Sequence, residues 1–178
     1  KDLMYCLLLP SANEAANILA EAVCGDVASF IELMNQRARE LGCTGTHFAN
    51  THGLHDDDHY TTAYDICLFT REALKHDLIR EVVGTSVYTV PATNLSQPRK
   101  LLNTNGLLTS AKHYGYTMDG TIGIKTGSTG EAGYCLVAAV QKKGHTLVSV
   151  VLGAQNPTDS RGNVQRKQFT ESKRLLNW

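Results

Sequence analysis

Apolar residues in the first half of the chain recur every three or four positions, a spacing that places them on one face of a helix. This pattern predicts helices over residues 2–9, 11–25, 26–41 and 77–83, and a further helix that begins at Thr62. Pro10, Gly42 and Gly84 follow three of these stretches, and both residue types are common at helix ends. For residues 11–25, the predicted apolar face is Ile18, Leu19, Ala22 and Val23.

The second half of the chain carries shorter apolar runs that are typical of strands. A short strand is expected at residues 87–90, then a loop over residues 92–100 and a turn leading into a helical Leu107-Leu108. The stretches around Lys125, Leu136 and Val148 predict three adjacent antiparallel strands, because Lys142-Lys143-Gly144 suits a tight hairpin turn. A polar loop over residues 154–168 and a closing helix over residues 169–178 complete the pattern.

Composition narrows the class of protein. With 178 residues, 42% hydrophobic content and a formal net charge of zero, the chain suits one globular domain. No basic stripe predicts a nucleic-acid partner, and no apolar segment approaches the roughly 20 residues that span a bilayer. Because the first residue is Lys1 rather than Met, we expect a processed or shortened piece of a longer protein.

Cysteines and histidines predict no metal site. The five cysteines are odd in number and form no C-x-x-C pair, so small buried thiols are expected rather than a disulfide framework. Residues 47–59 contain histidines and aspartates, which are the residue types that bind zinc. Only His55 and His59 have the i, i+4 spacing, and the three aspartates between them are typical of a solvated turn. We therefore expect no metal there.

Ser11-Ala12-Asn13-Glu14 opens the second predicted helix. The sequence S-x-x-E is a capping box, in which the serine hydroxyl accepts a hydrogen bond from an otherwise unpaired backbone N–H. On spacing alone, capping is favoured over a role in a functional site.

Lys125-Thr126-Gly127-Ser128 brings a cation to the end of a predicted strand. Glycines on both sides of Lys125 let the backbone approach a ligand closely, and the hydroxyls of Thr126 and Ser128 are neutral donors for an anion. This chemistry suits the capture of a carboxylate. The alternative is a hairpin with a solvated lysine and turn glycines, and Lys-Thr-Gly alone does not decide between the two.

Further stretches give these two motifs a family context. Ser-Asp-Asn and Lys-Thr-Gly motifs occur in penicillin-binding proteins and class A β-lactamases, and Ser11-Ala12-Asn13 and Lys125-Thr126-Gly127 match them. The match continues in residues 7–16, 46–54, 59–65 and 103–108. The chain resembles, nearly end to end, the low-molecular-weight penicillin-binding proteins that are serine-type D-alanyl-D-alanine carboxypeptidases (peptidase family S11).

The resemblance implies an α/β (α+β) fold of the β-lactamase/transpeptidase type, in which helices cover an antiparallel sheet and a helical lobe lies beside it. It implies that Ser11 relays a proton, that Asn13 holds the substrate amide, and that His52 and Leu54 line the cleft. It also implies that Lys125 is a catalytic residue beside Ser11 and Asn13 and helps to hold the substrate carboxylate. Thr126, Gly127 and Ser128 are implied to bind the substrate, and the Ser128 N–H to stabilise an oxyanion. No metal or organic cofactor is implied.

For the parent protein, the resemblance implies removal of the terminal D-alanine from peptidoglycan stem peptides through an acyl-enzyme. β-Lactam antibiotics would be suicide substrates, and no nucleic acid is involved. The implied location is extracytoplasmic, at the outer face of the cytoplasmic membrane or in the cell wall. Membrane association would come from segments absent from these 178 residues.

Two departures from the family pattern stand out. No serine has lysine at i+3, and the nearest approach, at Ser96, has arginine after a proline. We expect the Ser-x-x-Lys helix and two strands before Lys1, so that residues 1–178 form a partial domain that cannot acylate. The second departure is Gln168, which stands where many relatives have a carboxylate-binding arginine, with Arg166 or Arg161 as candidate substitutes.

Two other functions remain open from the sequence. A class A β-lactamase shares the motifs but needs a carboxylate-bearing loop, and no Glu-x-x-Leu-Asn is present. A non-catalytic module that binds peptidoglycan is the alternative from a different class. Saturable binding of a D-Ala-D-Ala peptide without turnover would favour the binding module.

Overall fold

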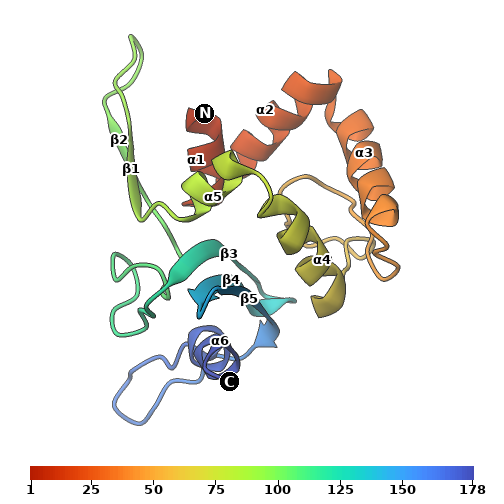
Figure 1. The fold of residues 1–178 in the computed structure, drawn as a ribbon. Coiled ribbons are helices and arrows are strands. Elements are labelled where there is room, and N and C mark those ends of the chain that lie inside the picture. Colours follow the sequence, from red (N-terminus) through yellow and green to blue (C-terminus); the bar gives the residue numbers. More distant parts are fainter.

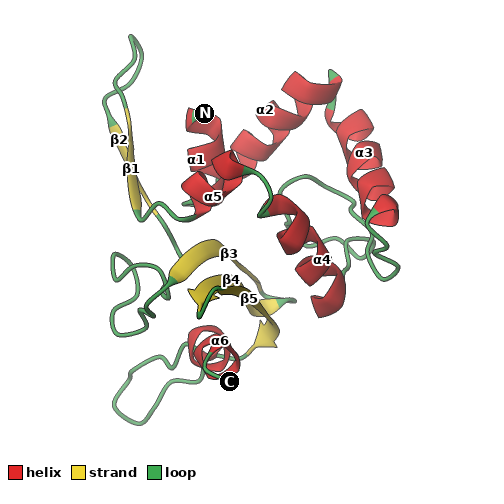
Figure 2. Cartoon of the chain, viewed as in Figure 1, coloured by secondary structure: helices red, strands yellow, loops and turns green.

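The computed structural model describes residues 1–178, which form a lobe of helices and a lobe built on a small sheet (Figures 1 and 2). The helices are α1 (Asp2–Leu8), α2 (Asn13–Cys24), α3 (Val27–Glu40), α4 (Ala63–Ala73), α5 (Asp77–Val83) and α6 (Lys167–Leu176). The strands are β1 (Val87–Val90), β2 (Arg99–Leu102), β3 (Thr121–Thr129), β4 (Gly133–Lys142) and β5 (His145–Ala154). Every predicted helix longer than two residues is present, with bounds shifted by three residues at most.

Local capping explains where the helices of the first lobe begin and end. The Asp26 carboxylate accepts a hydrogen bond from the Ser29 N–H at 2.8 Å at the start of α3. The Thr62 hydroxyl accepts one from the Asp65 N–H at 3.1 Å at the start of α4, where the sequence predicts that a helix begins. Gly25, directly after α2, has a φ of 86°, a left-handed conformation that glycine adopts without a Cβ clash.

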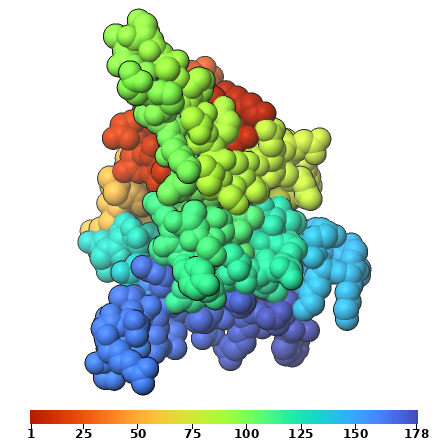
Figure 3. Space-filling view, turned by 90° about the vertical axis from the view of Figure 1, so that its left-hand side faces the viewer, coloured from red at the N-terminus to blue at the C-terminus, as the bar shows by residue number.

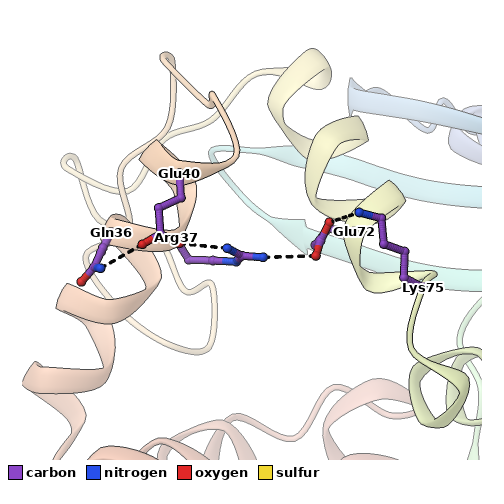
Figure 4. Close-up of polar contacts among 5 residues, drawn as sticks. All are labelled: Gln36, Arg37, Glu40, Glu72 and Lys75. Atoms are coloured by element: carbon purple, nitrogen blue, oxygen red, sulfur yellow. Dashed lines mark hydrogen bonds and ion pairs between the residues drawn. The ribbon is translucent and has the colours of Figure 1, made fainter.

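Ion pairs connect α3 and α4 on the exposed side of the helical lobe (Figure 4). Arg37 contacts Glu40 at 2.9 Å on its own helix and Glu72 at 3.1 Å on α4. Lys75 contacts the other oxygen of Glu72 at 2.6 Å. Because these side chains are largely in water, the network orients the two helices while contributing little to stability per pair.

Three details differ from the sequence-based predictions. Helix α2 buries the alanine stripe Ala15, Ala16 and Ala20, whereas Ile18 and Val23 are 47% and 65% exposed, because small side chains let neighbouring helices approach closely. Arg99 and Lys100 belong to β2 and not to the predicted loop. An exposed two-stranded ribbon needs no alternation of apolar and polar residues, so the sequence pattern did not reveal this strand. Leu107 lies in a buried turn and not in a helix.

The β1–β2 ribbon projects from the body of the molecule (Figure 3). Its base is fixed on α1, where the Tyr5 and Tyr88 rings stack with centroids 3.7 Å apart. The Tyr88 hydroxyl also donates to the Asp2 carboxylate at 2.7 Å. These contacts hold the base of the ribbon beside α1, and residues 103–105 follow directly after β2.

The second lobe is a three-stranded antiparallel sheet in the order β3-β4-β5, as predicted. Lys125 of β3 lies opposite Val137 of the central strand β4. One face of the sheet packs against α6, and the core between them consists of Leu107, Leu136, Ala138, Val140, Phe169 and Leu176. Since β4 is central, β3 and β5 each have one edge without a strand partner.

Residues 103–105 connect the two lobes through buried polar side chains. Asn103 and Asn105 are 1% and 0% exposed. The Asn103 amide donates to the carbonyl oxygens of Val83 and Thr85 at 3.2 and 3.0 Å, at the end of α5. The Asn105 amide donates to the Gly123 carbonyl of β3 at 3.0 Å, and its oxygen accepts from the Leu107 N–H at 3.0 Å. This segment thereby fixes β3 relative to the helices.

We expect Asn105→Ala to destabilise the fold by about 3 kcal/mol, because it leaves a buried carbonyl and a buried N–H unpaired. Urea unfolding of the variant measures the loss. Asn94→Ala, at an exposed position of the ribbon tip, is the control and should change the free energy of unfolding by less than about 0.5 kcal/mol. Equal stability of the two variants would contradict a connecting role for Asn105.

The free edge of β5 predicts self-association. This strand is ten residues long and has no proline and no Asp, Glu, Lys or Arg, and its Leu147 is 37% exposed. Such an edge is a template for pairing with another chain. We expect concentration-dependent dimers of the 178-residue chain in sedimentation velocity, and a monomer for Leu147→Lys. Leu175→Lys, at a 53% exposed position of α6, is the control and should still form dimers. Loss of dimers in both variants would exclude edge pairing.

Candidate functional site

An open cleft of about 640 Å³ lies between the two lobes. Strand β3 contributes the residues from Lys125 to Thr129. The turn between α1 and α2 and the loop at His52–Leu54 line the cleft from the helical lobe. Thr104, His113 and the start of α6 line it from the other lobe. None of the lining residues is Asp or Glu, so the cleft is suited to an anion.

The structure brings all six residues proposed from the sequence to this one cleft. They come from two distant parts of the chain and are Ser11, Asn13, Lys125, Thr126, Gly127 and Ser128. His52 and Leu54 also line the cleft, as expected. Their common location is a geometric finding, and their individual roles remain predictions.

The capping interpretation of Ser11 is wrong. Helix α2 has Ala12 as its N-cap and no side-chain capping bond. Ser11 has a φ of 67°, a conformation that side chains with a Cβ rarely adopt. Its hydroxyl makes no hydrogen bond within the chain and is exposed at the cleft, beside Asn13 in the first turn of α2. The strained backbone thus keeps the serine available to a ligand and away from the helix end.

Lys125 is the only lysine that lines the cleft. Its Nζ donates to the carbonyl oxygen of Thr126 at 2.7 Å, and no carboxylate pairs with it. Burial, with a further contribution from the charge of Lys112, lowers the pKa of Lys125 from 10.5 to about 8. At neutral pH the ammonium is therefore still charged, but it releases its proton far more readily than a solvated lysine.

The next residues of β3 are open to a ligand. A Cβ on Gly127 would meet no atom within 4 Å, so packing does not require glycine there and the backbone stays accessible. Ser128 is exposed. The Thr126 hydroxyl lies 2.5 Å from the Thr104 hydroxyl, which is its one hydrogen-bond partner within the chain. Together they supply neutral donors next to the Lys125 cation.

The structure distinguishes the three candidates for a second cation. Arg166, directly before α6, lines the cleft and forms no ion pair. Arg161 lies in an exposed turn around Asp159 and does not line the cleft. Gln168 lines the cleft but is 5% exposed and uncharged, and its Oε1 has no partner. The available guanidinium thus comes from Arg166, so Lys125 need not hold an anion alone.

Thr104 and His113 are among the cleft residues that the sequence did not indicate. Thr104 lies in residues 103–108, whose polar pattern predicts a turn and matches the family, but which carry no sign of a site residue. His113 lies in a tract with weak periodicity, and its ring packs on Phe169 with centroids 5.2 Å apart. Burial and the nearby charges of Arg166 and Lys112 lower its pKa. His113 therefore adds a neutral imidazole to this wall at neutral pH.

The structure also describes the remaining sequence features. No group of three or more His, Cys, Asp or Glu side chains is placed to hold a metal ion. All five cysteines are free thiols, but only Cys43 is fully buried, so the expectation of buried thiols was wrong for the other four. No helix is long and apolar enough to cross a membrane.

Comparison with known proteins identifies the family. The model of the D-alanyl-D-alanine carboxypeptidase family matches residues 1–156. The chain belongs to this family. It is 35% identical over 166 residues to D-alanyl-D-alanine carboxypeptidase DacF of Bacillus subtilis, covering 93% of the chain and 41% of that protein. It is 38% identical over 177 residues to D-alanyl-D-alanine carboxypeptidase DacC of Escherichia coli, and this match covers 99% of the chain and 40% of that protein. The chain thus spans about two fifths of these relatives.

Solved structures confirm the α/β transpeptidase-like fold predicted from the resemblance. A Streptomyces DD-transpeptidase superposes with a TM-score of 0.83 at 32% identity, covering 99% of this chain and 65% of that one. Penicillin-binding protein D2 from Listeria monocytogenes, solved with cefotaxime bound, superposes with a TM-score of 0.78 at 31% identity, covering 99% and 64%. These neighbours also extend well beyond the 178 residues.

The lowered pKa of Lys125 predicts a pH dependence of stability. Between about 8 and 10.5, the unfolded chain binds the lysine proton and the folded chain does not, so the free energy of unfolding should rise with pH. We expect this slope in wild type relative to Lys125→Met, which cannot titrate, in urea unfolding at several pH values. Lys143→Met, at an exposed turn, keeps Lys125 and should keep the wild-type slope. Loss of the slope in both variants would assign the effect to general charge and not to Lys125.

Proposed function

We propose that the cleft binds the C-terminal D-alanyl-D-alanine of a peptidoglycan stem peptide, and that the whole protein hydrolyses its terminal peptide bond as a serine-type carboxypeptidase. The observation that carries the proposal is the meeting of Ser11 and Asn13 with Lys125-Thr126-Gly127-Ser128 across one cleft that contains no carboxylate. The names of the relatives support this activity. The proposed site of action is outside the cytoplasmic membrane, where peptidoglycan lies.

Each part of the substrate has a matching group in the cleft. The terminal carboxylate would lie between Arg166, Lys125 and the hydroxyls of Thr126 and Ser128, because charge-assisted bonds to a carboxylate are strong. The Asn13 amide would hold the substrate amide. The Ser128 N–H would donate to the carbonyl oxygen that becomes an oxyanion. Ser11, free of any internal bond, would pass a proton to the leaving amine.

The acylating serine is proposed to come from a segment outside these 178 residues. Ser11 and Ser128 line the cleft, but neither has a lysine one helical turn later to activate it. A second, apolar hollow of about 410 Å³ lies between the sheet and helices α1, α4 and α5, and shares Lys125, Thr126, Gly127 and Cys135 with the cleft. Its remaining lining is largely aliphatic and aromatic and includes Leu8, Phe69, Ile124 and Leu152. An apolar helix carrying Ser-x-x-Lys would fill this hollow and reach the cleft through the residues that the two share.

β-Lactams are proposed as ligands of the same cleft. The Listeria neighbour was solved with cefotaxime bound. A β-lactam presents a carboxylate next to a reactive carbonyl, which matches the cation and oxyanion donors of the cleft. A β-lactamase activity is not favoured, because the relatives are carboxypeptidases.

The 178-residue chain should bind without acylation. We expect its intact mass to remain at 19.4 kDa after incubation with a fluorescent penicillin. A D-Ala-D-Ala peptide should nevertheless bind saturably in calorimetry and show no release of D-alanine. A covalent penicilloyl adduct would show that a nucleophile is present within the chain. Absence of saturable peptide binding would contradict the recognition role of the cleft.

Arg166 should contribute more to peptide affinity than Arg161. We expect Arg166→Ala to weaken binding of a D-Ala-D-Ala peptide by about tenfold or more, the usual cost of losing a charged hydrogen bond. Arg161→Ala removes the same charge from an exposed turn and should change the affinity by less than about twofold. Calorimetric titration of both variants gives the comparison. Equal losses would show that only the overall charge of the chain matters.

A further inference from the structure

We infer that Thr104 is a positioning residue that holds the Thr126 hydroxyl in the cleft and controls the direction in which it donates. No comparison assigns a role to Thr104. The inference rests on the proposed function for its ligand, a peptide carboxylate, but its structural part concerns two side chains of the chain itself.

Thr104 stands at the point where three parts of the molecule meet. It lies between Asn103 and Asn105, whose buried amides fix its backbone to α5 and β3. Its hydroxyl is 2.5 Å from the Thr126 hydroxyl and 3.3 Å from the carbonyl oxygen of Leu9, at the end of α1. With a single oxygen, Thr104 therefore contacts both the end of α1 and strand β3.

The two contacts cannot both use the Thr104 hydrogen. A carbonyl oxygen only accepts, so a bond to Leu9 takes the one hydrogen that Thr104 carries. In that arrangement Thr126 must donate to Thr104, and its hydrogen points away from a ligand. In the other arrangement Thr104 donates to Thr126 and gives up the long contact to Leu9. The hydrogen of Thr126 is then free to point into the cleft.

A carboxylate ligand selects the second arrangement. A carboxylate only accepts hydrogen bonds, so it needs Thr126 as a donor. The contact that is given up is the longer one, at 3.3 Å, and longer hydrogen bonds are weaker. When Thr104 donates to Thr126, it also polarises the Thr126 O–H, because hydrogen bonds in a chain strengthen one another. The two hydroxyls thus offer a hydrogen-bond donor to a bound anion. When no anion is bound, they still hydrogen-bond to each other and to the Leu9 carbonyl oxygen.

The test compares Thr104→Val, which has no hydroxyl, with Thr104→Ser, which keeps one. In the chain without ligand, three-bond couplings from the Thr126 γ-methyl carbon to the backbone N and C′ report its χ1 rotamer. We expect wild type and Thr104→Ser to show one rotamer and Thr104→Val to show averaging. Peptide affinity should fall about tenfold in Thr104→Val and less than about twofold in Thr104→Ser.

Thr85→Val is the matched control. The Thr85 hydroxyl donates to the Glu81 carbonyl at 2.8 Å and does not line the cleft. This variant also loses a hydroxyl-to-carbonyl bond, so it should lose stability without changing the Thr126 couplings or the affinity. Thr126 couplings in Thr104→Val that match wild type would overturn the inference. If wild type fails to bind the peptide, the proposed function fails, while the couplings still decide the role of Thr104.

Discussion

The structure depends on the need to satisfy the polar groups of a buried, irregular segment. Residues 103–105 lie inside the molecule without a helix or a ladder to pair them, so their side chains supply the hydrogen bonds. Asn103 bonds the end of α5, Asn105 bonds β3, and Thr104 contacts both α1 and β3. One short polar stretch therefore sets the distance between the lobes, and with it the width of the cleft.

The electrostatics of the cleft follow from this arrangement. Lys125 and Arg166 line a space without any carboxylate, and burial weakens the hold of Lys125 on its proton. An anion in the cleft would favour the charged form and raise the pKa of Lys125 again. Binding of a carboxylate is thus coupled to proton uptake wherever the pH is near or above 8. Under the proposed function, the same lysine would anchor a carboxylate when charged and would accept a proton when neutral.

Much of the fold was predictable because its signals are local. Thr62 caps α4, Gly42 follows α3, and Lys143-Gly144 turns β4 into β5, all within a few residues of their partners. The strand with Lys125 and its anion-binding chemistry were likewise visible in one stretch. Ser11 was misjudged on spacing, since S-x-x-E fits both a cap and a cleft residue, and only the backbone at Ser11 separates them. Helix α2 buries its alanine face because of the elements that pack against it, and the spacing of apolar residues along the helix does not indicate which elements those are.

The sequence named Arg166 only as one of two candidate arginines, and it gave no sign of His113. Their place in the cleft depends on how α6 and the preceding loop pack on the sheet, and no nearby residue pattern encodes that packing. The gain from the structure is largest for the apolar hollow between the sheet and helices α1, α4 and α5, because Lys125 lines both this hollow and the cleft. An apolar segment that filled it would remove water from Lys125 and lower its pKa further, and a lysine carried by that segment would act in the same direction. Under the proposed function, the groups that would bind a carboxylate lie within these 178 residues, whereas the proton affinity needed for acyl transfer would be set only when the hollow is filled.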